Sequence, residues 1–235
     1  MKKYMNIILF LLLFFFFFST QTHAAQRDQK FANEVGEQLY EILKQPDSLK
    51  VVVNKVDLWI EAKGADIDGI RVDNIGIRAK LKKGVDSYDK ENPANLIESS
   101  EGEIVLLEAD VNNYFAKEGA IKGFSELIFD FTSKGFSAEG KYAAEFLFNL
   151  TVPLSASGKL GIENDAVYLK ETILSIQGIS ATETISQFIV NKLNPLLSFK
   201  KIPFPITFDK IIMSDISAKM TSNPKPFSKG ATWSK

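Results

Sequence analysis

The chain contains no cysteine, and its single histidine, His23, lies near the N-terminus. Beyond residue 24 the sequence therefore cannot build a Ser-His-Asp or Cys-His catalytic group, a thiol redox centre or a His/Cys zinc site. A lipoprotein anchor attached through cysteine is excluded as well. Only carboxylates, lysines, hydroxyls and bound ions remain for chemistry. The sequence predicts a protein that is not an enzyme and has no cofactor or metal site.

An excess of positive charge is also missing. The chain has 28 Lys and Arg against 29 Asp and Glu, and loss of the first 24 residues would remove two basic residues and no acidic one, which leaves a net charge of −3. Nucleic-acid-binding proteins concentrate basic residues on one face to release counterions from phosphates. Here both signs are interleaved along the chain, so nucleic acid is excluded as a partner.

A long apolar run occurs at the N-terminus alone. Lys2 and Lys3 precede twelve apolar residues, 7–18, and small polar residues follow up to Ala24. A membrane-spanning helix needs about 20 apolar residues, whereas this pattern is typical of a secretory signal. We expect residues 1–24 to be a signal peptide cleaved after Ala24 or Ala25, and the protein to be exported to a bacterial periplasm or cell envelope. The alternative is an uncleaved anchor.

Three segments carry apolar residues at helical spacing: 28–45, 108–118 and 180–197. Pro46 ends the first, Gly119 can cap the second, and Pro195 kinks or ends the third. Each predicted helix is amphipathic, so its apolar face has to pack against another element.

Most of the remaining sequence alternates apolar and polar residues, which predicts strands. The predicted strands cover 55–63, 70–81, 104–107, 127–131, 136–152, 154–162, 167–176 and 206–220, with Trp59 as an exception on a polar face. Turn residues at 133–135, at Pro153 and at 163–165 divide the later strands into a long antiparallel meander. Two or three helices against such strands give an α+β fold, in one domain over residues 25–221.

Residues 222–235 form a tail rich in Pro, Ser and Lys, which we expect to be disordered. Basic and aromatic side chains alternate in it: Lys225, Phe227, Lys229, Trp233 and Lys235. Such a mixture can touch an anionic membrane surface, where each lysine contributes about 1 kcal/mol. Transient contact with a membrane surface is the alternative to a free tail.

Two short motifs that could carry chemistry have simpler explanations. Residues 66–69, Asp-Ile-Asp-Gly, suggest a calcium loop, but an EF-hand requires a Glu where this chain has Ile77. Turn-forming acids between two strands explain them. Ser198 and Lys201 have the Ser-x-x-Lys spacing of some serine hydrolases, without the accompanying Ser-Asp-Asn or Lys-Thr-Gly. A lipid hydrolase that needs no histidine is the enzyme alternative.

Phenylalanine is abundant, since six of the nineteen lie before residue 24 and thirteen follow it. Several cluster between residues 129 and 148. An ordinary filled core would use these alternating positions, and a lipid-binding groove would use them equally well. A groove gains about 25 cal/mol for each Å² of acyl surface that leaves water. Periodicity alone does not distinguish the two.

The order of motifs resembles a known family. Residues 104–112, Ile-Val-Leu-Leu-Glu-Ala-Asp-Val-Asn, are similar to the strand and the Thr-Glu-x-Asp-Leu-Asn helix of the LmeA-like phospholipid-binding proteins of the bacterial periplasm, with Leu107 in place of Thr. The stretch 140–178, the helix 180–197 and the Lys-Ile-Pro-Phe-Pro-Ile of 201–206 are similar to that family's ending. The resemblance spans nearly all of the chain after residue 24.

The resemblance implies a long, curved antiparallel sheet wrapped around two or three amphipathic helices, as in the half-barrels of tubular lipid-binding proteins. It implies a phospholipid or another acyl lipid as the partner and supplies no catalytic residue. We expect a non-catalytic envelope protein that binds or transfers phospholipid in a hydrophobic groove; the alternative is a structural or interaction protein with a filled core. The residues expected to line the groove are Leu58, Ile60, Ile77, Leu81, Phe129, Phe131, Phe146, Phe148, Leu150, Phe188, Leu193 and Leu197.

Overall fold

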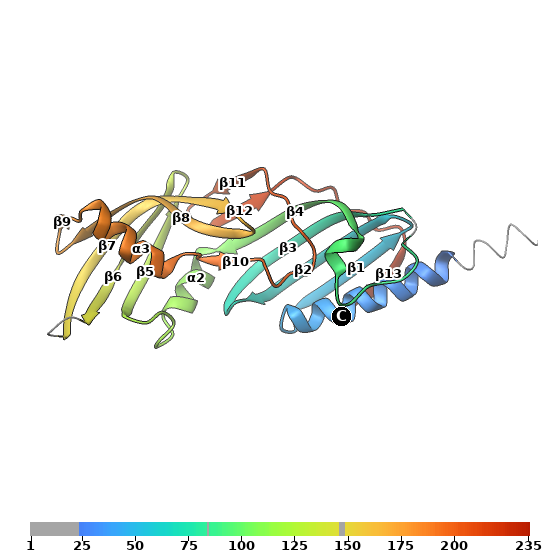
Figure 1. Cartoon of the computed structure of the whole chain (residues 1–235), viewed down its shortest axis with the longest axis horizontal. Coiled ribbons are helices and arrows are strands. Elements are labelled where there is room, and N and C mark those ends of the chain that lie inside the picture. Colours follow the sequence, from blue (N-terminus) through green and yellow to red (C-terminus); the bar gives the residue numbers. More distant parts are fainter. Residues whose placement is uncertain (1–23, 84, 146–148) are drawn as a thin grey trace, which may run out of the picture.

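The computed structural model describes residues 24–83, 85–145 and 149–235, and in them two antiparallel sheets lie end to end along the long axis (Figure 1). Sheet A has the order β11-β12-β4-β3-β2-β1-β13: Lys210–Met213, Ser217–Thr221, Ile97–Leu107, Ile70–Leu81, Asp57–Ile67, Ser48–Asn54 and Ala231–Ser234. Sheet B has the order β10-β8-β7-β6-β5: Leu197–Ser198, Ala166–Ile176, Asn149–Glu163, Gly135–Glu145 and Phe124–Thr132, with β9 (Ile179–Ser180) paired to β8. The predicted α+β class is confirmed, but the single long sheet is wrong.

Helices occupy three places around these sheets. Residues 24–42 are helical and lie along sheet A, α2 (Glu108–Phe115) contacts both sheets, and α3 (Glu183–Leu193) packs on sheet B (Figure 1); a short 3₁₀ helix, η1, spans Pro93–Leu96. All three predicted helices are therefore present. The third ends earlier than predicted because Asn194, which precedes Pro195, has extended backbone angles.

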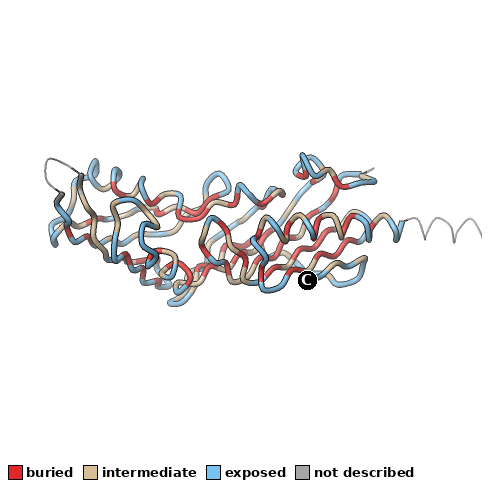
Figure 2. Tube along the Cα trace, turned by 90° about the horizontal axis from the view of Figure 1, so that it is seen from below, coloured by how far each residue is buried: buried red, intermediate tan, exposed pale blue. Residues whose placement is uncertain are grey.

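One face of sheet A contributes the largest share of the main core. Its apolar side chains pack against Phe31, Val35 and Leu39 of the N-terminal helix. The irregular segment 199–209 covers the β4 side of the same face, where a Cβ on Gly102 would overlap Ile206. Figure 2 shows the buried strands beneath the helix. This face of sheet A is therefore covered by the N-terminal helix and segment 199–209.

The opposite face of sheet A is covered by the C-terminal tail, so the prediction that residues 222–235 are disordered is wrong. Arg78 donates a hydrogen bond to the carbonyl of Lys225 at 3.1 Å, and its guanidinium lies 5.7 Å from the centroid of the Phe227 ring. Arg78 is the cross-strand neighbour of Trp59, which is only 6% exposed. Trp59, the apolar exception on a polar strand face, is thus buried.

The end of the tail completes sheet A. β13 pairs with β1 over Lys50–Val53, and Trp233 reaches the N-terminal helix, where its ring lies 6.4 Å from that of Tyr40. A Cβ on Gly36 would overlap the indole, so the helix approaches the strand closely at that glycine. The tail lacks periodicity because its contacts are made by isolated side chains, Phe227 with Arg78 of β3 and Trp233 with the N-terminal helix.

Several strand boundaries differ from the prediction: β4 begins at Ile97 instead of residue 104, and β6 ends at Glu145 instead of residue 152. Two further differences have a local cause. The segment 206–220 contains a hairpin, β11 and β12, because the Ser214 hydroxyl accepts from the Ser217 amide at 3.1 Å and makes a turn. Pro153 lies inside β7 instead of ending a strand. Its carbonyl accepts from Gln177 at 3.1 Å, so its missing N–H faces a position just beyond the end of β8.

Candidate functional site

The concave face of sheet B carries a row of apolar side chains across four strands. Phe129, Ala138, Ala156 and Leu174 are successive cross-strand neighbours on β5, β6, β7 and β8. The two central positions hold alanine and the two flanking positions hold large side chains. This alternation of size makes a hollow along the middle of the sheet.

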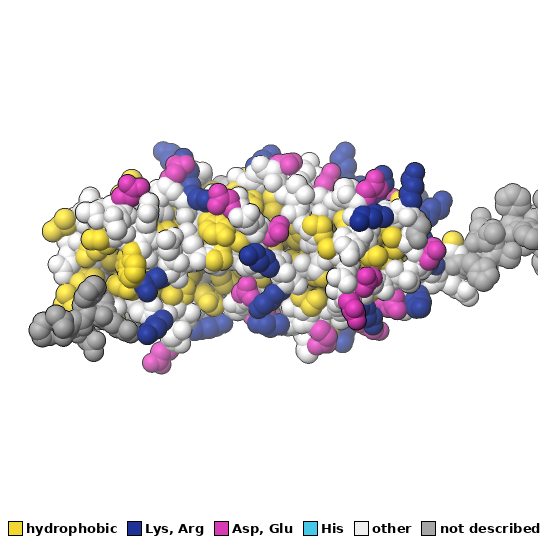
Figure 3. Space-filling view, viewed as in Figure 1, with side chains coloured by type: hydrophobic (Ala, Val, Ile, Leu, Met, Phe, Trp, Pro, Cys, Tyr) yellow, Lys and Arg dark blue, Asp and Glu magenta, His cyan; other side chains and the backbone are white. Residues whose placement is uncertain are grey.

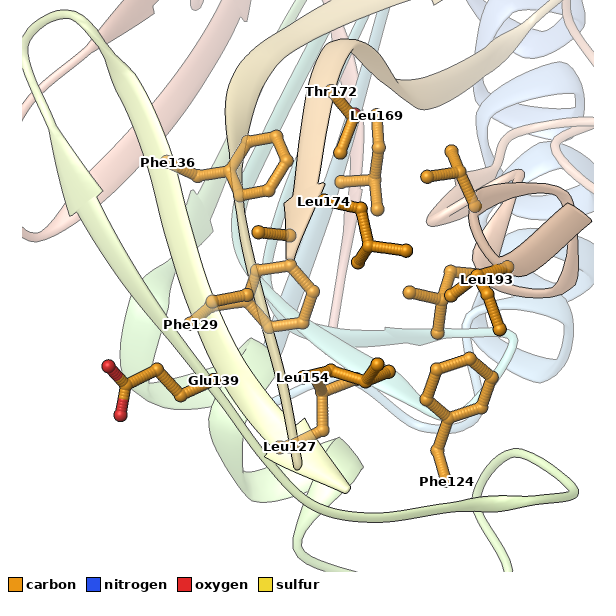
Figure 4. A pocket seen from close by; sticks show the side chains of 15 residues that line it. Phe124, Leu127, Phe129, Phe136, Glu139, Leu154, Leu169, Thr172, Leu174 and Leu193 are labelled. Carbon is orange, nitrogen blue, oxygen red and sulfur yellow. The ribbon is translucent and has the colours of Figure 1, made fainter. Parts of the chain in front are cut away.

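Helix α3 fills the hollow with one apolar stripe. Ile189 and Leu193, one turn apart, are buried, and Val190 is half-buried beside them. The space left between sheet and helix is about 20 Å³ and is lined by apolar groups, with Thr172 and Glu139 as the polar exceptions. Figure 4 shows Phe129, Leu154 and Leu174 pointing toward the α3 residues, while Glu139 points away. We call this space the sheet B interior.

An open cleft adjoins the sheet B interior along the outer edge of β8. It has a volume of about 880 Å³ and lies between β8 and the polar flank of α3. β10 pairs with β8 at Ala166–Val167 and β9 pairs at Ser175–Ile176, so the edge between them faces the cleft. Four residues line both spaces: Leu169, Thr172, Leu174 and Val190. These four residues separate the cleft from the apolar interior.

Three charged side chains at the cleft rim form ion pairs, and a fourth, Glu183, accepts a hydrogen bond from Gln187 at 3.0 Å. Lys170 lies 2.6 Å from Glu163, and Glu171 lies 2.6 Å from Lys159. Such exposed pairs contribute about 0–1 kcal/mol each. Because these ion pairs are weak, the rim side chains can form new polar contacts with a ligand. A polar rim beside an apolar interior suits an amphipathic molecule.

Side chains from α2 and from the residue after α3 close the edges of sheet B. On β5, Asn112 of α2 accepts from the Phe129 amide at 2.7 Å and donates to the Phe129 carbonyl at 2.8 Å. Glu108, one turn earlier, accepts from the Phe131 amide at 2.6 Å. These contacts give the Leu-Glu-Ala-Asp-Val-Asn motif of residues 107–112 a structural role that the sequence did not disclose.

The other edge of sheet B is closed in the same way. Asn194, directly after α3, accepts from the Leu169 amide at 2.8 Å and donates to the Leu169 carbonyl at 3.1 Å. This bond fixes the C-terminal end of α3 against β8. At its other end α3 begins with Thr182, whose hydroxyl accepts from the Ile185 amide at 3.5 Å.

The structure brings few of the predicted lining residues to the sheet B interior. Phe129 and Leu193 line it. Six others are at most 2% exposed in the main core and do not line this space: Leu58, Ile60, Ile77, Leu81, Phe131 and Leu197. Leu150 and Phe188 are more than half exposed. Phe146 and Phe148 lie outside the described residues.

Sequence reasoning missed most of the lining. The further apolar residues are Phe124, Leu127, Phe136, Ala138, Leu154, Ala156, Leu169, Leu174, Ile189 and Val190. Strand alternation places many of them on the same face as Phe129, so the face was predictable. Ala138 and Ala156 alternate with larger residues on this face, and these small side chains were the sequence signal for a hollow. The local sequence did not indicate which helix would cover it.

The structure gives Ser198 and Lys201 no hydrolase geometry. The Lys201 ammonium lies 2.6 Å from Asp68, and this hydrogen bond raises the pKa of Lys201 above its ordinary value. A lysine that acts as a general base needs a lowered pKa. Asp66 accepts from the Gly69 amide at 2.9 Å in the turn between β2 and β3, which confirms the turn predicted for 66–69.

Comparison of the chain with protein-family models, with curated proteins and with solved structures finds no match in any of the three. The resemblance to LmeA-like proteins therefore stays a prediction that depends on the sequence motifs. No helix within residues 24–235, as far as they are described, is long and apolar enough to cross a membrane.

Proposed function

We propose that the chain is a non-catalytic binding module for a phospholipid or another acyl lipid. The acyl chain lies in the sheet B interior, between the Phe129–Leu174 row and α3, and the head group stays in the cleft beside β8. One observation carries this proposal: an interior lined by apolar groups from four strands and a helix shares four lining residues with a neighbouring cleft that has a polar rim.

Such binding depends mainly on the apolar contact. Burial of acyl surface contributes about 25 cal/mol per Å² and is not directional. Specificity for chain length is therefore modest, and selection among head groups falls to the rim residues Glu163, Lys170, Glu171 and Glu183.

Entry of a chain requires α3 to move outward, because about 20 Å³ holds roughly one water molecule. Small-molecule pockets usually measure about 300–1,000 Å³. α3 is attached to the sheet through few buried residues, Ile189 and Leu193, and Phe188 of the same helix is 57% exposed. An acyl chain replaces the contacts that the helix loses.

The N-terminal sequence supports export as part of the proposal. Lys2, Lys3 and the apolar run 7–18 are typical of a secretory signal. A protein that binds or transfers phospholipid in the periplasm or cell envelope would have its ligand in the adjoining membranes. No step of the proposal requires a nucleophile, a metal ion or a cofactor.

A structural or interaction protein of the envelope is the second candidate. The observation that favours it is the same small volume: with α3 in place, the interior is nearly filled by side chains. In that case α3 would stay closed, and the chain would act through its surface.

Filling the hollow tests the proposed function. Ala156→Phe places a ring in the sheet B interior, and it should abolish co-purification of lipid from a bacterial host because the acyl chain loses its space. Ser157→Phe adds the same ring to the exposed outer face of β7 and serves as the matched control. Lipid is quantified by extraction and mass spectrometry, and circular dichroism verifies folding. Equal lipid content in both folded variants would contradict this placement of the ligand.

A further inference from the structure

Four large apolar residues are exposed together around the free end of sheet B. Leu150 on β7 is 58% exposed, Ile179 on β9 is 74% exposed, and Ile185 and Phe188 of α3 are 44% and 57% exposed. We call these four residues the tip patch. Figure 3 shows hydrophobic side chains gathered at this end of the molecule, on the left. Exposed apolar groups that cluster in this way mark a contact surface.

The tip patch continues the face that forms the sheet B interior. Ile179 is the cross-strand neighbour of Ile176, and Ile176 is the neighbour of Leu154, which lines the interior. Leu150 precedes the buried Val152 by two residues and so lies on the same face of β7. An apolar surface therefore runs from the interior to the outside of the protein without a polar row between them.

A cation borders the patch. On α3, Ile185, Phe188 and Lys192 follow one another at helical spacing beside the buried stripe. The Lys192 ammonium lies 4.9 Å from the centroid of the Phe188 ring and 6.0 Å from that of Tyr142. The side chain of Lys192 thus lies between the exposed Phe188 ring and the half-buried Tyr142 ring, where its charge can meet a phosphate.

We propose that the tip patch docks onto a lipid bilayer, with its apolar side chains among the acyl chains and Lys192 at the level of the phosphates. This rests on the proposed function, because lipid would pass between the bilayer and the interior along the continuous apolar face. A two-fold contact between copies of the chain would instead bring two Lys192 ammonium groups into one interface. Charge complementarity therefore favours the bilayer.

The docking end differs from the one that the sequence suggested. The aromatic residues and one lysine of the tail contact sheet A or the N-terminal helix: Phe227 contacts Arg78, Trp233 contacts Tyr40, and Lys235 lies 4.0 Å from the Tyr40 ring, while Lys225 and Lys229 are exposed. Membrane contact thus moves from the C-terminal tail to the tip patch.

Absence of cysteine from the chain makes a site-specific test simple. Single variants Ile179→Cys and Phe188→Cys carry an environment-sensitive fluorophore at the patch. Ile128→Cys, 61% exposed on the outer face of β5, and Ile216→Cys, 71% exposed between β11 and β12, are matched controls. The full chain is mixed with vesicles of phosphatidylcholine and phosphatidylglycerol. We expect a blue shift and brightening at residues 179 and 188 and no change at 128 and 216.

All four labelled proteins carry the same N-terminal segment, so any membrane affinity of that segment affects them equally. The difference between patch and control positions therefore reports on the tip patch. Equal signals at all four positions, or none at the patch, would overturn the proposal. A blue shift without vesicles that grows with protein concentration would also overturn it, in favour of a second copy of the chain. Lys192→Gln should weaken partitioning onto phosphatidylglycerol-containing vesicles about five-fold, as expected for one lysine at an anionic surface, and leave phosphatidylcholine vesicles unaffected.

The same labelled proteins report on the proposed function separately. Their bound lipid is measured by mass spectrometry after extraction. Lipid retained in the interior by variants whose patch probes do not respond would overturn docking and leave lipid binding intact. Patch probes that respond in a chain without bound lipid would support docking and count against the proposed interior site.

Discussion

Asn112 and Asn194 imitate a neighbouring strand at the two edges of sheet B. Each side-chain amide accepts from and donates to the same residue, Phe129 on β5 and Leu169 on β8. An open edge with unpaired N–H and C=O groups is a template for aggregation. One residue therefore closes an edge and also fixes a helix, α2 or α3, to the sheet.

Loss of one such side chain should be costly. Asn112→Ala leaves the amide and carbonyl of Phe129 without partners, and we expect the free energy of unfolding to fall by about 1–3 kcal/mol. Asn113→Ala, at an exposed position of the same helix, should change it by less than about 0.5 kcal/mol. Urea unfolding measures both. Similar values for the two variants would show that the edge bonds do not stabilise the fold.

Tyr88 makes the stability of the fold sensitive to alkaline pH. It is 8% exposed, lies edge-on to Phe31 and shares a hydrogen bond with Gln38. Burial, followed by the charges of Asp89 and Glu34, raises the pKa of Tyr88. The folded state therefore keeps the neutral phenol while the unfolded chain ionises.

The corresponding stability is fully present below the unfolded-state pKa of about 10 and is lost as the pH rises from there toward the raised folded-state pKa. We expect the free energy of unfolding of the native chain to fall as the pH increases above about 10. Tyr88→Phe should show a smaller fall across the same range, since it has no phenol to ionise at that position. Urea unfolding at a series of pH values tests this, and parallel curves for the two proteins would assign the loss to other groups.

Local pattern was sufficient for some elements and insufficient for others. α3 and strands β5 and β8 follow their periodicity because each has one face mostly covered and the other mostly exposed. β1 is different: Val51, Val52 and Val53 are all fully buried, since β1 contacts the core on one face and has its other face covered as well. Because β1 lacks alternation of apolar and polar residues, the sequence pattern did not predict it as a strand. The tail could not be predicted because its order depends on contacts with residues more than 100 positions away.

The order of the tail leads to a prediction about a pair of residues. Gly36→Ala should lower the free energy of unfolding by about 1–3 kcal/mol, because the added methyl overlaps the Trp233 indole. In a Trp233→Ala background the same change should cost almost nothing, since the ring is gone. A double-mutant cycle by thermal or urea unfolding measures this coupling. Additive effects would mean that β13 does not pack against the N-terminal helix.

At the scale of the molecule, the two sheets differ in how they are covered. Sheet A has the N-terminal helix and segment 199–209 on one face and the tail on the other. Sheet B has α3 on its concave face and an outer face with exposed residues such as Ile128 and Ser155. An outward movement of α3 would expose the concave face of sheet B and leave the core of sheet A covered, because the residues on sheet A pack against the N-terminal helix and segment 199–209. The candidate site could be predicted from sequence only as a set of apolar faces, because Leu58 and Phe129 have equivalent patterns and differ in what packs on them.

The central claim, that the sheet B interior holds a lipid, is tested most directly by native mass spectrometry. The protein is exported to a bacterial periplasm, purified without detergent and measured before and after organic extraction. The account predicts a mass excess of lipid size that disappears on extraction, with phospholipid recovered in stoichiometric amount. A bare polypeptide mass that stays unchanged after incubation with liposomes would contradict it and identify α3 as a permanent part of a filled core.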